Sequence, residues 1–300
     1  MAAGDLLTAV GQIQYGNLLI GRGTPYSYKR LSGWAELPAL DSGTVLRSGA
    51  HGAYPGLLLA QSRTIGLDGL MVRAPRASIG AAVDVLEAGL VPVVDELPLA
   101  FWADERGPRL VWARCLRYML PMEKGYRVGT ILGGAVQWEA TDARRYGLTE
   151  RTVTASLPMP EPGLNWGTDP GPESLDWPLS FGAVGSAGGM SATNAGNAET
   201  HPVVEFRGPV LRPSLTNLQT GDVLEYDLPL AAGDVLVVDT RAGTVTLNGT
   251  ASRLYTVTAR SVPEQTFTLA PGTTDLLFRA APESSDPAAS ALVRYRPAYW

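Results

Sequence analysis

The sequence predicts a mainly β protein of two domains, and three observations lead to that prediction. Its 300 residues include 34 Gly and 23 Pro, which suits many short strands joined by turns. A hydrophobic content of 45% is enough to fill packed cores. The two halves differ in charge: residues 1–150 hold 15 basic and 14 acidic residues, and residues 151–300 hold 9 and 15. We therefore expect one domain over residues 1–147 and another over residues 148–300.

The first half contains a single helical pattern. Residues 76–90 place apolar side chains at helical spacing, with Ser78 as N-cap and Pro92 as the stop. Residues 99–103, 109–116 and 135–140 are apolar or alternating runs bounded by Gly and Pro, and they predict strands.

The second half follows a cleaner strand pattern. The runs DVLEYDLPL, GDVLVVDT, GTVTLNGT, RLYTVTA, QTFTLAPG, TDLLFRA and ALVRYRPAYW succeed one another at the spacing of a sandwich or barrel. Asn248-Gly249 predicts a tight hairpin, because both residues tolerate positive φ.

A proline-rich segment separates the halves. Residues 156–182 contain six prolines, which remove backbone donors and favour extended chain, so we interpret the segment as a semi-rigid arm or connector. The first residues lack the pattern of a signal peptide, and no apolar run is long enough to span a membrane.

Candidate chemistry is sparse. His51 and His201 have no metal-ligand partners at suitable spacing, and both are expected in turns or at a strand edge. The single cysteine, Cys115, is expected as an apolar core residue of a strand. The loop after Asp239 lacks the further acids of a calcium loop. The sequence thus predicts no catalytic residues, no metal and no cofactor, and the net charge of −5 disfavours a nucleic-acid-binding surface.

Motifs along most of the chain, in the same order, resemble siphophage distal tail proteins. In the second half they are an N-x-G-x-x-E-T-x-P entry from Asn194 to Pro202, followed by the pairs Gly208-Pro209, Thr220-Gly221, Gly233-Asp234, Asp239-Thr240, Asn248-Gly249, Pro271-Gly272 and Tyr295-Arg296, with Asn217 among them. In the first half they are LLIGRGTPYSYKRLSGW, HGAYPG, SRTIGLDGLMV and QWEATDARRYG, the last with Trp138, Asp142 and Tyr146.

The resemblance implies a structural virion protein. Its fold would be an N-terminal tail-tube-like β-sandwich with one helix and a C-terminal galectin-like β-sandwich. Six copies would form a ring at the distal end of a phage tail, joining the tail tube protein to the tail-tip hub protein and carrying receptor-binding or fibre proteins. DNA would pass through the lumen without specific binding. Such a protein is made in the host cytoplasm and ends in the virion, without membrane insertion.

The segment of residues 31–56 is too long for an ordinary connection and yet carries apolar residues. Because apolar residues in a loop need a cover, we expect it to pack on the adjacent subunit. The candidate interface residues are Leu31, Trp34, Leu37, Leu40, Val45 and Leu46.

Two other functions stay open at this stage. A carbohydrate-binding β-sandwich module that contacts the host surface would need an aromatic platform. Only Trp166, Trp177 and Trp300 are candidates in the second half. A glycoside hydrolase would need two converging carboxylates, and no pair stands out.

Overall fold

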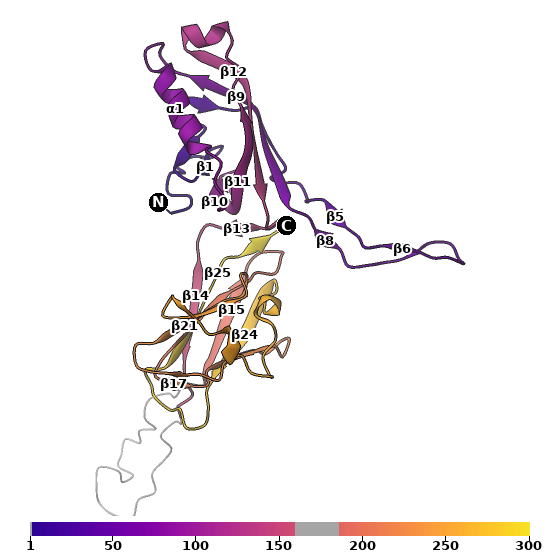
Figure 1. Ribbon diagram of the computed structural model, residues 1–300, viewed down its shortest axis with the longest axis vertical. Helices are drawn as coiled ribbons and strands as arrows, with labels where there is room; N and C mark the ends of the chain where they lie inside the picture. Colours follow the sequence, from indigo (N-terminus) through magenta and orange to yellow (C-terminus); the bar gives the residue numbers. More distant parts are fainter. Residues whose placement is uncertain (1, 160–185) are drawn as a thin grey trace, which may run out of the picture. The chain divides into compact units, whose positions relative to one another are not determined.

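The computed structural model describes residues 2–159 and 186–300, and the chain divides into two compact units (Figure 1). The first unit comprises Met1–Leu148 together with Tyr299–Trp300, and the second comprises Thr149–Ala298. The last two residues, which the sequence placed in the second domain, therefore belong to the first unit. The Arg109 guanidinium lies 3.5 Å from the centroid of the Tyr299 ring, and the Arg145 guanidinium donates to the carbonyl of Trp300.

The first unit is built on antiparallel strands that follow the order β2-β1-β10-β11-β12-β9-β3. Strand β4 also pairs with β9, and β13 pairs with β11 and β26. The strands are β1 (Ile13–Tyr15), β2 (Leu18–Ile20), β3 (Tyr26–Ser27), β4 (Arg30–Ser32), β9 (Arg63–Arg73), β10 (Leu97–Phe101), β11 (Arg109–Met119), β12 (Thr130–Ala140), β13 (Arg145–Gly147) and β26 (Ala298–Tyr299).

Strand β11 links two parts of this sheet. Its first residues pair with β10, and its later residues, from Arg114 onward, pair with β12. The register shifts between Cys115 and Arg117, at a β-bulge, and such bulges bend a strand. Cys115 is buried there, as expected for a core residue.

The predicted helix is present as α1 (Ile79–Gly89) and contacts β2 and β9. It buries Ile79, Ala82, Val83 and Leu86, the apolar positions that share one helical face. Ser78 precedes the helix, but its hydroxyl makes no capping bond and instead donates to the carbonyl of Pro75. A 3-10 turn, η1 (Lys124–Val128), lies between β11 and β12.

The second unit is a sandwich of two main sheets. One has the order β14-β25-β16-β21-β22-β23, and the other has the order β15-β24-β18-β19. A short pair, β17-β20, lies beside them. The strands are β14 (Arg151–Ser156), β15 (Gly189–Asn194), β16 (Val203–Arg207), β17 (Val210–Leu211), β18 (Ser214–Asn217), β19 (Val223–Glu225), β20 (Pro229–Leu230), β21 (Val235–Asp239), β22 (Thr244–Leu247), β23 (Ala251–Ser252), β24 (Gly272–Arg279) and β25 (Ser290–Tyr295).

Alternate residues of the two sheets fill the core between them. Val204 and Phe206 of β16 point inward from one sheet, and Leu276 and Phe278 of β24 point inward from the other. The rings of Phe206 and Phe278 stack with centroids 5.9 Å apart. Each inward side chain of this size contributes about 1.5–3 kcal/mol when it is removed from water.

The prediction of a strand is wrong for two segments of the second unit. RLYTVTA forms the 3-10 turn η2 (Leu254–Thr256), and QTFTLAPG begins with the turn η3 (Glu264–Thr266). Phe267 and Leu269 are fully buried, so the apolar alternation there reflects burial of a loop and not a sheet ladder. The Asn248-Gly249 hairpin is confirmed: both residues have positive φ, between β22 and β23. Most of the proline-rich segment, residues 160–182, lies outside the described residues.

Candidate functional site: a projecting hairpin

A long hairpin projects from the first unit between β4 and β9 (Figure 1). Its inner part pairs β5 (Leu40–Asp41) with β8 (Leu59–Ala60), and its outer part pairs β6 (Val45–Leu46) with β7 (Ala53–Tyr54). The root is closed by the amide of Gln61, which donates to the carbonyl of Ala39 at 2.9 Å. We call residues 37–61 the long hairpin.

The long hairpin exposes an unusual amount of apolar surface. Leu46 is 83% exposed and Leu57 is 80% exposed. Such residues gain nothing in the isolated chain, because the hydrophobic effect acts only when apolar surface is removed from water. Contiguous apolar surface of this kind marks a binding site. The large exposed apolar residues of the hairpin are Leu37, Leu40, Val45, Leu46, Tyr54, Leu57, Leu58 and Leu59.

Four of the six predicted interface residues lie on this hairpin, and two do not. Leu37, Leu40, Val45 and Leu46 are among its exposed residues. Leu31 instead lies in β4 and packs on the core of the first unit. Trp34 is 4% exposed, and its ring meets that of Phe101 edge to face at 5.4 Å. The segment is also a hairpin and not an irregular loop, because turns and short strand pairs satisfy part of its backbone hydrogen bonding.

Arg63, which the sequence analysis missed, fixes the root of the hairpin. Its side chain is 1% exposed. Its Nη1 donates to the carbonyls of Gly33 at 2.7 Å and Glu36 at 2.6 Å, in the bend between β4 and β5, and its Nε donates to the carbonyl of Ala143 at 2.7 Å. Burial lowers the pKa of Arg63, while the charges of Asp142 and Glu36 act in the opposite direction. The sequence does contain a signal for this burial. Arg63, Ile65 and Leu67 alternate along β9, so they share one face of the strand, and that face points toward the core.

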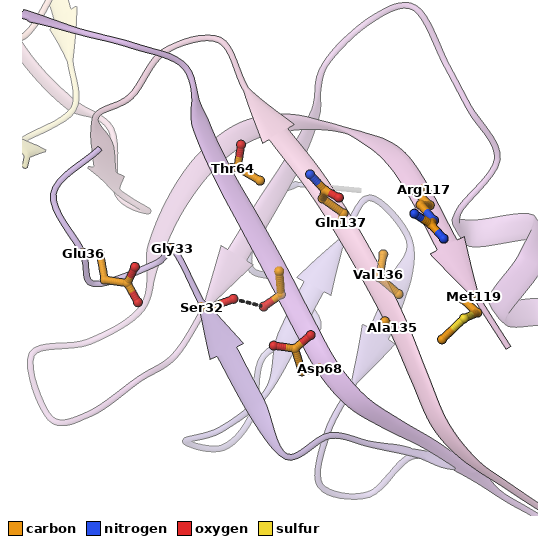
Figure 2. Close-up of a pocket in the computed structure, with 11 residues that line it drawn as sticks. Ser32, Gly33, Glu36, Thr64, Asp68, Arg117, Met119, Ala135, Val136 and Gln137 are labelled. Carbon is orange, nitrogen blue, oxygen red and sulfur yellow. Dashed lines mark hydrogen bonds between the residues drawn. The ribbon is translucent and has the colours of Figure 1, made fainter. Parts of the chain in front are cut away.

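An open groove lies beside this root, on the face of the sheet opposite the core (Figure 2). It has a volume of about 430 Å³. Small residues of β4, β9 and β12 form much of its lining, Glu36 lies on one side of it, and Arg117 and Met119 of β11 lie on the other side. The lining residues are Ser32, Gly33, Glu36, Thr64, Gly66, Asp68, Arg117, Met119, Ala135, Val136 and Gln137.

The resemblance motif Asp-x-x-x-Tyr also has a structural explanation. The Tyr146 hydroxyl donates to Asp142 Oδ2 at 2.6 Å, and the Arg144 guanidinium pairs with Asp142 Oδ1 at 3.0 Å. Burial alone would raise the pKa of Asp142, but the Arg144 contacts and the Tyr146 hydroxyl outweigh it, so this pKa lies below its ordinary value. The motif closes the turn that leads into β13.

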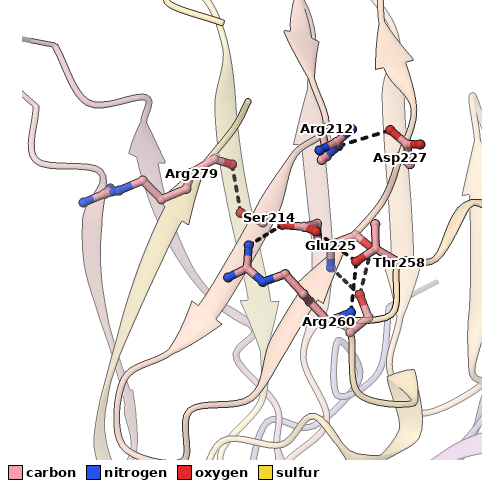
Figure 3. Close-up of polar contacts among 8 residues, drawn as sticks. Arg212, Ser214, Glu225, Asp227, Thr258, Arg260 and Arg279 are labelled. Atoms are coloured by element: carbon pink, nitrogen blue, oxygen red, sulfur yellow. Dashed lines mark hydrogen bonds and ion pairs between the residues drawn. The ribbon is translucent and has the colours of Figure 1, made fainter. Parts of the chain in front are cut away.

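The polar cluster around Glu225 in the second unit is also structural (Figure 3). The Glu225 carboxylate accepts hydrogen bonds from Thr258 and Arg260, each at 2.9 Å, and the Ser261 hydroxyl bonds the backbone of Glu225. Nearby, the buried Tyr226 hydroxyl donates to Glu264 at 3.1 Å, and burial followed by the Glu264 charge raises the Tyr226 pKa. These contacts hold the loop of residues 253–266 against β19.

The remaining polar candidates belong to different elements of the two units. His51 is exposed at the tip of the long hairpin, whereas His201 lies before β16 in the second unit. Burial raises the pKa of the Cys115 thiol, which disfavours the reactive thiolate. Asp239 accepts the amides of Arg241 and Ala242 and so closes a turn. Within residues 2–159 and 186–300, no three potential metal ligands cluster, and no helix is long and apolar enough to cross a membrane.

Comparisons with known proteins show what this chain is similar to. Residues 195–299 match the family model described as siphovirus-type tail component, C-terminal domain. No curated protein sequence matches the chain. The structure is similar to that of SPP1 Dit (gp 19.1), described as a paradigm of the hub adsorption apparatus in phages that infect Gram-positive bacteria. The two are 13% identical, with a TM-score of 0.64, and the match covers 95% of this chain and 97% of that chain.

A second similar structure is a chain of the phage P2 baseplate in its activated conformation with Ca. It is 11% identical, with a TM-score of 0.52, and the match covers 95% of this chain and 97% of the other. At these identities the likeness establishes the fold. Together with the family match, it confirms the resemblance to siphophage distal tail proteins: the chain has the Dit fold, and residues 195–299 match the model of a siphovirus-type tail component.

Proposed function

We propose that this protein forms a six-membered ring at the distal end of a phage tail, and that the long hairpin of each subunit packs on its neighbour. The observation that carries the proposal is the set of exposed apolar residues on the hairpin, because no part of the described chain covers them. The Dit fold supports the same role, since the similar SPP1 protein is described as part of a hub adsorption apparatus.

The two domains would have different roles. Residues 1–147 would form the ring and join the tail tube protein to the tail-tip hub protein, and DNA would pass through the lumen without specific contacts. Residues 148–300, a galectin-like sandwich, would face outward as a platform for receptor-binding or fibre proteins. The protein would be made in the host cytoplasm and would act in the virion as a structural part and not as an enzyme.

The carbohydrate-binding alternative has less support. Stacking on a sugar needs an exposed aromatic platform. The described residues of the second unit include no Trp, and Tyr255 is the one strongly exposed aromatic side chain among them. Trp300 belongs to the first unit. Trp166 and Trp177 lie outside the described residues.

Negative-stain imaging of the purified chain tests the proposal when it is paired with a shortened hairpin. Residues 40–60 are replaced by Asn-Gly, which closes the strands next to the hydrogen bond between Ala39 and Gln61. We expect rings from the full chain and folded monomers from the shortened one. Rings of normal appearance from the shortened chain would remove the hairpin from the interface.

A further inference from the structure

A second, much smaller pocket of the first unit is lined by arginines. It is formed by the bend after β4, by the turn between β10 and β11, and by the starts of β11 and β13. Its volume is about 30 Å³. We call it the arginine pocket, and its lining includes Trp34, Phe101, Asp104, Arg106, Arg109 and Arg145.

We propose that the arginine pocket binds a single carboxylate group, held by the guanidinium groups of Arg109 and Arg145 and by the indole N–H of Trp34. The site lies within one chain, so the proposal does not depend on the ring. It adds a ligand site to a chain in which the sequence predicted none.

The charge of the pocket favours an anion. Three guanidinium groups and one carboxylate line it, which gives a formal charge of +2. The carboxylate, Asp104, already accepts the Nε of Arg106 at 2.8 and 3.0 Å. Burial, followed by the charges of Arg63, Arg109 and Arg106, lowers the pKa of Arg145 to about 10. A negative group beside Arg145 would offset this repulsion between like charges.

The pocket also contains hydrogen-bond donors that have no acceptor. Within the described part of the chain, the Arg109 guanidinium makes no hydrogen bond or ion pair, and it lies over the Tyr299 ring. Arg145 donates to the carbonyl of Trp300, but its Nε has no acceptor. Trp34 is 4% exposed, and its indole N–H has no acceptor among the described residues. Buried donors without acceptors are costly, so a ligand that accepts from them is favoured.

Size and shape select a carboxylate among the anions. A site for one water molecule needs about 10–15 Å³, so the pocket has room for about two oxygen atoms. A carboxylate presents two oxygens with about four acceptor positions, and it matches the fork of a guanidinium. The rings of Trp34 and Phe101, which meet edge to face at 5.4 Å, form an apolar wall. Hydrogen bonds to a charged group are stronger beside such a wall than in water.

The bound group would connect three segments that are distant in the sequence. Trp34 belongs to the bend that leads into the long hairpin, Arg109 begins β11, and Arg145 begins β13. A carboxylate between them would therefore slow the local opening of these segments. The same group can come from a small free acid or from an acidic side chain of a bound protein.

Hydrogen exchange of the full chain tests the site. Exchange is compared in sodium formate and in sodium methanesulfonate, whose head group is larger, at one ionic strength of about 0.1 M. A ligand that binds only the closed pocket slows exchange through local opening. We expect formate to slow exchange about threefold or more in residues 33–36, 104–109 and 145–147, and to leave the second unit unchanged.

Two variants and a control assign this effect to the pocket. Arg109→Met should abolish it, and the variant should fold because this guanidinium makes no hydrogen bond within the described chain. Trp34→Phe keeps an aromatic ring, removes the N–H, and should reduce the effect by about half or more. Arg117→Met, at an exposed position farther along β11, is the matched control and should keep the full effect. Melting curves verify that each variant is folded.

Each outcome decides the proposal. Equal exchange in formate and methanesulfonate would overturn it, and so would a formate effect that persists in both Arg109→Met and Trp34→Phe. If Arg109→Met does not fold, Trp34→Phe alone decides. Propionate, which carries the carboxylate on a short chain, distinguishes the two sources. Protection by propionate equal to that by formate would assign the site to an acidic side chain of a bound protein, and protection by formate alone would assign it to a small free acid.

Discussion

Burying an arginine destabilises the folded state unless its N–H donors are hydrogen-bonded. Most of the donors of Arg63 are bonded to backbone carbonyls. Burying a charged group without partners costs several kcal/mol. Three of its four acceptors, the carbonyls of Gly33, Trp34 and Glu36, belong to the bend that leads from β4 into the long hairpin. Most of the hydrogen bonds of Arg63 therefore fix the direction in which the long hairpin leaves the first unit.

We predict that Arg63→Met destabilises the first unit by about 2–4 kcal/mol, because several buried carbonyls lose their donor. It should also speed hydrogen exchange of amides in residues 33–41 more than elsewhere. Urea unfolding and hydrogen exchange measure the two effects. Arg73→Met, at the exposed end of the same strand, is the control and should cost less than about 0.5 kcal/mol. Equal exchange in both variants would contradict the anchoring role.

A second residue-scale prediction concerns acid. The Asp142 pKa is lower in the folded chain than in the unfolded chain, so Asp142 contributes stability above the unfolded value of about 3.9. That contribution is lost as the pH falls from the pKa of Asp142 in the unfolded chain toward its lower pKa in the folded chain. Asp142→Asn should therefore lower stability at pH 7 and weaken the loss of stability between pH 5 and pH 2. Urea midpoints across this range measure it. A pH dependence unchanged from the original chain, with Asp84→Asn as the control, would contradict the assignment.

At the scale of elements, the long hairpin is a ribbon whose apolar residues do little for the isolated subunit. We predict that Leu46→Ser combined with Leu57→Ser leaves the free energy of unfolding of the monomer within about 0.5 kcal/mol, because both side chains are already in water. Assembly should weaken strongly, since these residues would be buried only between subunits. Thermal melting and sedimentation separate the two effects. Loss of monomer stability would show instead that the hairpin folds onto its own domain.

The elements show how far sequence reasoning reached. Hydrophobic periodicity was sufficient to predict α1 and β11, because their apolar residues follow the spacing of a helix and of a strand, respectively. It failed for RLYTVTA and QTFTLAPG, where apolar residues are buried by neighbouring loops. For residues 31–56 the sequence predicted a long loop with apolar residues, whereas the structure forms a hairpin there. Its root could not be separated from its tip, because only packing distinguishes the buried Trp34 from the exposed Leu37.

At the scale of the whole molecule, the two units have separate cores. We predict that residues 149–298 fold alone into a monomer with a cooperative melt, because a unit of about 150 residues can bury a sufficient core. Residues 1–148 should self-associate, since they carry the long hairpin. Sedimentation and melting of the two fragments test this division. Association of the C-terminal fragment, with a monomeric N-terminal one, would reverse the roles.

The measurement that tests the account most directly is the mass of the assembled full-length chain. The chain has a mass of 31.8 kDa, and the proposed ring holds six copies. Sedimentation equilibrium or native mass spectrometry should find a species of six chain masses, and it should disappear when residues 40–60 are replaced by Asn-Gly. A full-length chain that stays at one chain mass at every concentration, or a hexamer that persists without the hairpin, would contradict the account.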